Sequence, residues 1–177
     1  MVSRSRERVS GLNPLKRLVY LISPDKINNK FYSVLEEVLS YGNVKYFQLR
    51  LKKIKARTLI KIATKIRKIT FKYKVKFIIN DNYIVAIKSK ADGCHIGQLD
   101  GSVKDVKKKL KTKILGVTCH NSKTLARNAI KNNVSYIAFG SFFKSKLKPN
   151  AKKASLNILR WSKKNNIPVM LSEFGAI

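Results

Sequence analysis

The chain has 177 residues, of which 39 are Lys or Arg and 9 are Asp or Glu, so its formal charge is +30 at pH 7. This length suits one domain, and a hydrophobic content of 44% can build a core and excludes a wholly disordered chain. No apolar run approaches the roughly 18 residues of a membrane-spanning helix, and none follows the basic start as a secretory signal would. We therefore expect a cytoplasmic protein that does not contact a membrane.

Residues 1–16 are rich in Arg and Ser and contain a single acid, Glu7. An organelle transit peptide can have this composition, but a flexible basic N-terminal extension is the simpler interpretation. Residues 17–177 are then expected to form a single domain.

The high positive charge would attract nucleic acid or another polyanion. Nucleic-acid-binding proteins usually concentrate that charge on one element and interleave it with exposed aromatic side chains. Here the basic residues are spread along the whole chain. We therefore expect no specific nucleic-acid recognition, and the sequence leaves the oligomeric state open.

The two cysteines, Cys94 and Cys119, are each followed by a histidine, His95 and His120. These four residues suggest a zinc site. Both pairs fall in strand-like segments, however, where consecutive side chains point to opposite faces, so one face could receive only one ligand from each pair. Buried thiols and structural or polar-site histidines are the favoured interpretation.

Short runs of β-branched and aromatic residues alternate with segments of helical spacing. In chain order, the expected strands are residues 18–22, 44–51, 75–80, 93–96, 114–118, 136–140 and 167–171. Helices are expected between them, and Ser102, Ser122 and Ser155 are suited to cap three of these. This alternation implies parallel strands and right-handed crossovers. Since no glycine-rich nucleotide-binding loop follows the first strand, we expect an α/β fold of the (β/α)8 TIM-barrel type, truncated after strand seven.

Polar residues at the end of the second strand point to an anionic ligand. Alternation places Gln48, Arg50 and Lys52 on one face, toward the barrel interior, while Phe47 and Leu49 face the helices. An inward Arg–Lys pair would be costly without an anionic partner, and a diphosphate supplies one. Two surface charges beyond the strand's last turn are the alternative.

Two of the few acids, Asp81 and Asp100, close neighbouring strands. Two carboxylates facing an Arg–Lys pair suit Mg²⁺ bound to a diphosphate, because Mg²⁺ prefers one or two carboxylates together with phosphate oxygens and water. Helix N-capping explains the two positions equally well.

The sixth strand leads into a basic loop that contains Ser145, Lys146, Leu147 and Lys148. A loop of this kind after a late barrel strand can hold a phosphate group. In so Lys-rich a chain, a basic surface loop is an equal alternative.

Taken together, these segments resemble the thiamine-phosphate synthase family, which shares a superfamily with the thiazole tautomerases. The resemblance runs from about Leu18 to Leu171. The matching motifs occur in the family's order and are QLRLK at 48–52, ND at 80–81, ADGCHIGQLD at 91–100, GVTCH at 116–120, YIAFG at 136–140 and the loop through Lys148.

The resemblance implies a (β/α)8 fold and a Mg²⁺-dependent transferase of thiamine biosynthesis. The reaction would join 4-amino-5-hydroxymethyl-2-methylpyrimidine diphosphate to hydroxyethylthiazole phosphate, giving thiamine phosphate and diphosphate. In that family the diphosphate leaves, and the thiazole nitrogen captures the resulting pyrimidine cation. Carried over by motif, the residues that would hold the pyrimidine diphosphate are Gln48, Arg50, Lys52, Asn80, Thr118 and Lys148. Asp81 and Asp100 would hold Mg²⁺.

The thiazole phosphate would be lined by Ser145, Lys146 and Leu147, with Gly175 as a weaker match. Here the chain departs from the family. Leu147 stands where a second threonine is usual, Thr118 replaces a serine, and the turn after strand seven brings in an acid, Glu173. The pyrimidine half of the site therefore looks intact and the thiazole half impaired. Two alternatives remain, a related thiazole tautomerase and a non-catalytic, truncated barrel that binds polyanions.

Overall fold

The computed structural model describes residues 19–142 and 153–171. The predicted extension, residues 1–16, lies outside the described residues. The strands are β1 (Val19–Ile22), β2 (Val44–Leu49), β3 (Lys76–Asn80), β4 (Gly93–Ile96), β5 (Ile114–His120), β6 (Tyr136–Phe139) and β7 (Val169–Leu171). The helices are α1 (Lys30–Ser40), α2 (Ala56–Lys72), α3 (Tyr83–Lys88), α4 (Val103–Leu110), α5 (Lys123–Lys131) and α6 (Leu156–Lys164).

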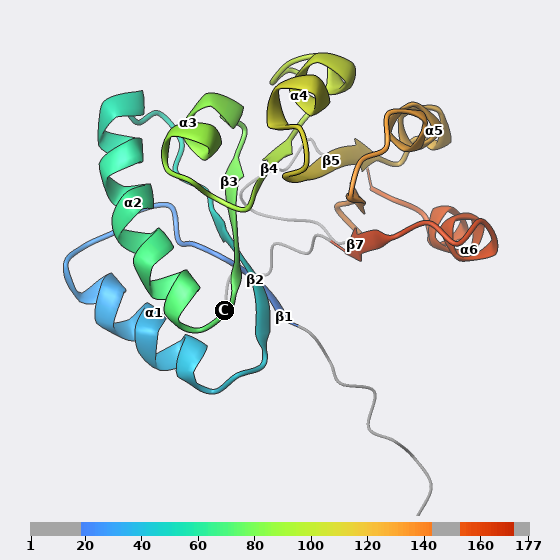
Figure 1. Ribbon diagram of the computed structural model, residues 1–177. Coiled ribbons are helices and arrows are strands. Elements are labelled where there is room, and N and C mark those ends of the chain that lie inside the picture. The colour runs from blue at the N-terminus through green and yellow to red at the C-terminus, as the bar shows by residue number, and fades with distance from the viewer. Residues whose placement is uncertain (1–18, 143–152, 172–177) are drawn as a thin grey trace, which may run out of the picture.

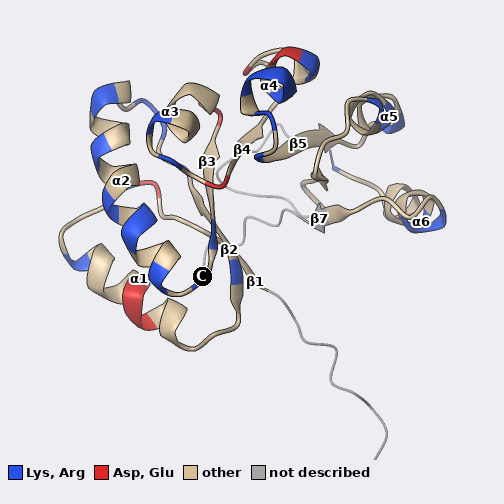
Figure 2. Cartoon of the chain, viewed as in Figure 1, with Lys and Arg blue, Asp and Glu red and all other residues tan. Residues whose placement is uncertain are grey.

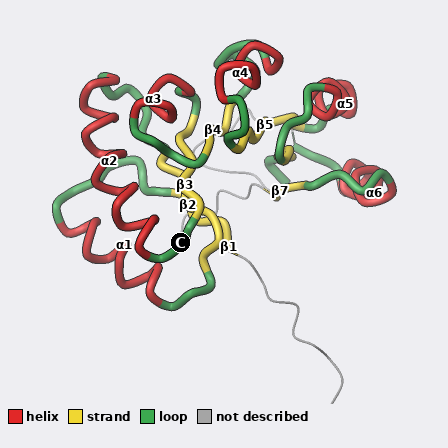
Figure 3. The backbone as a smooth tube through the Cα atoms, viewed as in Figure 1, coloured by secondary structure: helices red, strands yellow, loops and turns green. Residues whose placement is uncertain are grey.

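The seven strands form one parallel sheet in the order of the sequence, from β1 to β7. The sheet curves, and the helices lie on its outer side (Figures 1 and 3). This is the arrangement of a barrel in which β1 and β7 remain unpaired edges within the described part of the chain. The predicted α/β barrel architecture is confirmed.

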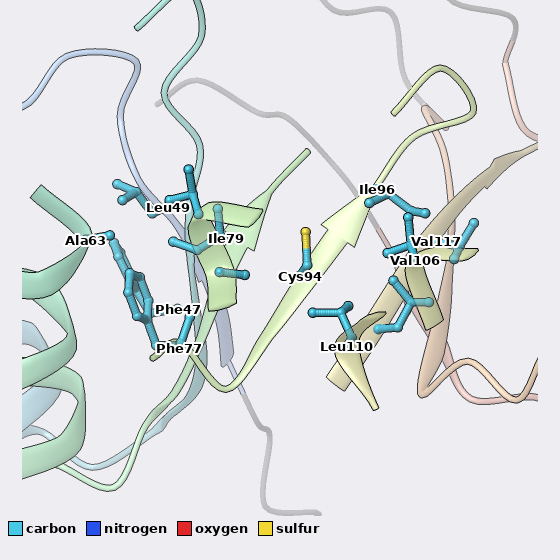
Figure 4. Close-up of a cluster of buried hydrophobic side chains, with 14 of the residues drawn as sticks. Phe47, Leu49, Ala63, Phe77, Ile79, Cys94, Ile96, Val106, Leu110 and Val117 are labelled. Atoms are coloured by element: carbon cyan, nitrogen blue, oxygen red, sulfur yellow. The ribbon is translucent and has the colours of Figure 1, made fainter. Parts of the chain in front are cut away.

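The main hydrophobic core lies between the sheet and the helices. Strand residues that point outward, such as Phe47, Phe77 and Cys94, pack there with Ala63 of α2 and Leu110 of α4 (Figure 4). The rings of Phe47 and Phe77 stack with their centroids 6.2 Å apart. The alternate strand residues therefore point to the inner face, where the polar groups gather.

Most of the predicted helix starts are confirmed. Ser102 and Ser122 accept hydrogen bonds from the backbone amides of Asp105 and Leu125 and so cap α4 and α5. Ser155 is the N-cap residue of α6 but makes no side-chain capping bond to it. The short segment after β3 also forms a helix, α3, which is capped by Asn82.

Basic residues outnumber acidic ones on the outer surface, although α1 carries Glu36 and Glu37 with a single lysine, Lys30. Lys and Arg are distributed over all of the helices and are not gathered on one of them (Figure 2). No helix in the described ranges is both long and apolar enough to cross a membrane.

Candidate functional site

Gln48 and Asn80 meet on the inner face, near the carboxyl ends of β2 and β3. Gln48 is only 4% exposed, and its amide nitrogen donates a hydrogen bond to the Asn80 side-chain oxygen. The parallel register pairs Gln48 with Ile78, so Asn80 lies two residues further along β3, on the same face and nearer the strand end. Two of the six residues predicted to hold a pyrimidine diphosphate are therefore direct neighbours.

Arg50 follows β2 and reaches toward the segment after β1. Its backbone amide donates to the hydroxyl of Ser23 at 2.9 Å, and its guanidinium lies 3.0 Å from a carboxylate oxygen of Asp25. The Arg50 side chain is only 14% exposed. The contacts explain why β2 ends at Leu49 and not at Leu51 as predicted, since the Arg50 amide bonds to a side chain.

Asp100 lies close enough to Asp81 to disturb the ionisation of Asp81. The pKa of Asp81 is raised to about 6 by burial and, next, by the negative charge and hydrogen bonding of Asp100. The positive charges of Lys52 and Arg50 oppose this rise. These four of the predicted charged residues are therefore near one point of the inner face.

Neither acid is a helix cap, so the capping alternative is wrong. The N-caps of α3 and α4 are Asn82 and Ser102. Asp81 is held in the left-handed region at φ 64°, and its backbone amide donates to the His95 carbonyl at 2.7 Å. Asp100 accepts a hydrogen bond from the amide of Gly97, also at 2.7 Å.

The donor set of this pair suits Mg²⁺, because it offers carboxylate oxygens that repel one another and lie beside basic groups. The described ranges contain no group of three or more His, Cys, Asp or Glu residues that could hold a metal unaided. Phosphate oxygens and water would have to complete the coordination, as Mg²⁺ commonly requires. Cys94 points into the outer core and the His95 ring to the inner face, as the strand alternation predicted.

Thr118 joins the same inner face from β5. Its hydroxyl lies 2.8 Å from Nε2 of His95, and its carbonyl accepts a hydrogen bond from the Gln98 side chain. Lys148 and the predicted thiazole-phosphate residues lie outside the described residues: Ser145, Lys146, Leu147 and Gly175.

The described residues that flank this loop are anchored near the ends of β5 and β6. The Ala154 amide donates to the Ser141 carbonyl at 2.7 Å, and the Ser155 amide donates to the Asn121 side chain at 3.1 Å.

Comparisons with known proteins identify the family. A family model described as thiamine monophosphate synthase matches residues 19–172. The chain belongs to the thiamine monophosphate synthase family.

The similar proteins carry the same name. A thiamine-phosphate synthase of Pelagibacter ubique is 48% identical over 157 residues, which is 88% of this chain and 76% of the relative. One from Erythrobacter litoralis is 38% identical over 81% of this chain and 70% of the relative. The solved thiamine phosphate pyrophosphorylase from Pyrococcus furiosus superposes with a TM-score of 0.77 at 25% identity, covering 90% of this chain and 76% of that one. The predicted family membership is thus confirmed.

Three further residues of this family member were not singled out from its sequence: Tyr20, His95 as a hydrogen-bonding group, and Tyr136. The Tyr20 hydroxyl lies 2.7 Å from that of Tyr136, which in turn lies 3.0 Å from Nδ1 of His95. The only sequence signal was their inward position on β1, β4 and β6. In the structure, Gly116 leaves room for the Tyr136 ring, since a Cβ there would lie 2.1 Å from it.

Proposed function

We propose that this chain joins 4-amino-5-hydroxymethyl-2-methylpyrimidine diphosphate to hydroxyethylthiazole phosphate, forming thiamine phosphate and releasing diphosphate. The observation that carries the proposal is the close pair of Asp81 and Asp100 with Arg50 and Lys52 beside it. Such a cluster suits a metal-bound diphosphate and is costly to maintain without one. Membership of the synthase family supports the same reaction.

In this proposal the basic residues and amides receive the diphosphate. Arg50 and Lys52 balance its negative charge, and Asn80, held by Gln48, offers amide hydrogens. The bond between the pyrimidine methylene carbon and the diphosphate oxygen breaks, and the electron pair leaves with the diphosphate. The thiazole nitrogen lone pair then forms the new carbon–nitrogen bond. Preorganised positive charge is the main aid that the protein gives to such a departure.

Mg²⁺ would be held by Asp81 and Asp100, and when bound it supplies further positive charge to the departing diphosphate. The mutual repulsion of the two acids would then be relieved.

A thiazole tautomerase is the less favoured function. That activity processes no diphosphate, so it gives no reason to keep two close acids beside two cations. The polyanion-binding alternative is weakened because the basic residues occur on every helix and are not gathered on one element (Figure 2).

The test is release of diphosphate from the two substrates in the presence of Mg²⁺. We expect turnover by the wild-type protein and a loss of at least about a hundredfold in Asp100→Asn, the scale for removing a preorganised charged group. Glu37→Gln, which neutralises an exposed acid on α1, is the matched control and should retain activity. Unchanged turnover in Asp100→Asn would sink the metal assignment. No turnover by the wild-type protein, with tight binding to unrelated DNA at physiological salt, would favour the polyanion-binding function.

A further inference from the structure

One continuous chain of side-chain hydrogen bonds crosses the inner face of the sheet. Its middle members are well buried, with exposed fractions of 4% for Gln48, 7% for Tyr136 and 9% for His95. In order, its members are Asn80, Gln48, Tyr20, Tyr136, His95 and Thr118. Both ends of this chain are residues predicted to bind the pyrimidine substrate.

The direction of the first bonds follows from the orientation of the Gln48 amide, whose nitrogen faces Asn80 and whose oxygen faces Tyr20. Gln48 donates through its amide nitrogen to Asn80, so its oxygen is the group that accepts from the Tyr20 hydroxyl at 2.9 Å. A phenol has only one hydrogen to donate. Tyr20 has therefore used its hydrogen, and in the 2.7 Å contact between the two tyrosines the donor must be Tyr136.

The same count fixes the tautomer of His95. Tyr136 has given its hydrogen to Tyr20, so Nδ1 of His95 must donate to the Tyr136 oxygen at 3.0 Å. The ring is buried, and both of its nitrogens contact hydroxyl groups only, so a charged imidazolium would be costly there. A neutral ring with its hydrogen on Nδ1 leaves Nε2 as an acceptor, and Thr118 must donate to it at 2.8 Å.

We infer that the Thr118 hydroxyl can only accept a hydrogen bond from the ligand, and that it therefore recognises the amino group of an aminopyrimidine and not an oxygen of the diphosphate. This deepens the proposed function and rests on it. Diphosphate oxygens offer only lone pairs to a hydroxyl whose hydrogen is already used.

Asn80, at the other end of this series of hydrogen bonds, offers donors to the ligand where Thr118 offers an acceptor. The Asn80 oxygen is occupied by Gln48, so the ligand meets the amide hydrogens of Asn80. The series of hydrogen bonds thus presents donors to the ligand at Asn80 and an acceptor at Thr118. Tyr20, Tyr136 and His95 are positioning residues, because they impose this polarity without touching the ligand.

The tautomer can be measured without any substrate. We expect ¹⁵N NMR to show His95 with its hydrogen on Nδ1. The chain has two histidines, so His120→Asn assigns the signal, and asparagine tolerates the left-handed backbone of that position, φ 50°. In Tyr136→Phe the acceptor for Nδ1 is lost, so the hydrogen should move to Nε2. Tyr46→Phe is the matched control, because the Tyr46 ring stacks on Tyr20 while its hydroxyl makes no hydrogen bond within the described residues. A wild-type His95 protonated on Nε2 would overturn the inference.

Calorimetry with two probes then tests the ligand contact. Thr118→Val should weaken binding of the free aminopyrimidine, 4-amino-5-hydroxymethyl-2-methylpyrimidine, by about tenfold, the scale of one lost hydrogen bond. It should leave binding of Mg²⁺–pyrophosphate unchanged, and Thr118→Ser should restore the aminopyrimidine affinity. Weaker pyrophosphate binding with unchanged aminopyrimidine binding would overturn the inference. If neither probe binds the wild-type protein, the proposed function fails. The tautomer of His95 then decides the inferred direction of the hydrogen bonds by itself: a hydrogen on Nδ1 supports that direction, and a hydrogen on Nε2 refutes it.

Discussion

Replacing Asp81 with asparagine should stabilise the metal-free protein while destroying its proposed activity. The carboxylate is half-buried beside Asp100, and its pKa is raised from 3.8 to about 6. Asparagine has nearly the same shape and is well tolerated at the φ of 64° that Asp81 adopts, so the change removes charge without adding backbone strain. The backbone bond from this amide to the His95 carbonyl is kept.

The magnitude follows from the pKa. A rise from 3.8 to about 6 spans about two pKa units, and each is worth about 1.4 kcal/mol, which gives a ceiling of about 3 kcal/mol. Because the group is only partly buried and solvent screens it, we expect about half of this. For a chain of this size, the corresponding gain in Tm is about 3–6 °C.

The sign of the pH dependence is equally specific. The folded state holds the Asp81 proton to a higher pH than the unfolded state does, so ionisation costs stability as pH rises from about 4 to about 6. Near pH 4 the wild-type protein and Asp81→Asn should therefore have nearly equal stability. Above pH 6 the variant should be the more stable by the full amount.

Thermal unfolding between pH 4 and pH 8 measures this difference, with Glu37→Gln as the charge-matched control. In a chain of charge +30, loss of an acid should in general leave stability unchanged or slightly lower, so a gain confined to Asp81→Asn is diagnostic. Added Mg²⁺ should raise the Tm of the wild-type protein more than that of the variant. An equal gain in the control, or a gain that does not vary with pH, would refute the reasoning.

Two more substitutions probe the surroundings of the site. In Gly116→Ala the new Cβ would lie 2.1 Å from the Tyr136 ring and 2.3 Å from its hydroxyl, so the ring must move. Chemical denaturation should show a loss of about 1–3 kcal/mol in the free energy of unfolding. An unchanged midpoint would contradict the placement of Tyr136. Asp25→Asn removes a carboxylate that lies 3.0 Å from the Arg50 guanidinium and would repel a bound diphosphate. Calorimetry should therefore show that Mg²⁺–pyrophosphate binds a few-fold more tightly to this variant. Weaker binding would show that Asp25 chiefly holds Arg50 in position.

The strands and their order could be predicted because both depend on local patterns. Alternating apolar residues identify each strand, and the crossover rule then fixes the parallel order. The differences lie at strand ends, where tertiary contacts decide. β5 runs on to His120 through a register shift, and β7 begins at Val169, just after Pro168, which cannot donate a backbone hydrogen bond. Propensity in one segment carries no information about such contacts.

The acids at the strand ends show where local reasoning stops. Spacing alone fitted Asp81 and Asp100 equally well as caps or as metal ligands, because both sit where strands pass into helices. The neighbours Asn82 and Ser102 do the capping, so the two acids are left to face each other. The residues just beyond the acids are better caps, and the sequence already predicts this for Ser102, but not for Asn82.

The hydrogen-bond chain could not have been predicted in this way at all. Tyr20 and Tyr136 are 116 positions apart and lie on strands that are not neighbours in the sheet, so no pairing rule brings them together. They meet only because the sheet curves and Gly116 leaves room for the Tyr136 ring. The polarity that we assign to Thr118 therefore arises from the barrel as a whole. A motif comparison places a hydroxyl at position 118. Only the series of hydrogen bonds that reaches Thr118 through His95 determines which way that hydroxyl points its hydrogen.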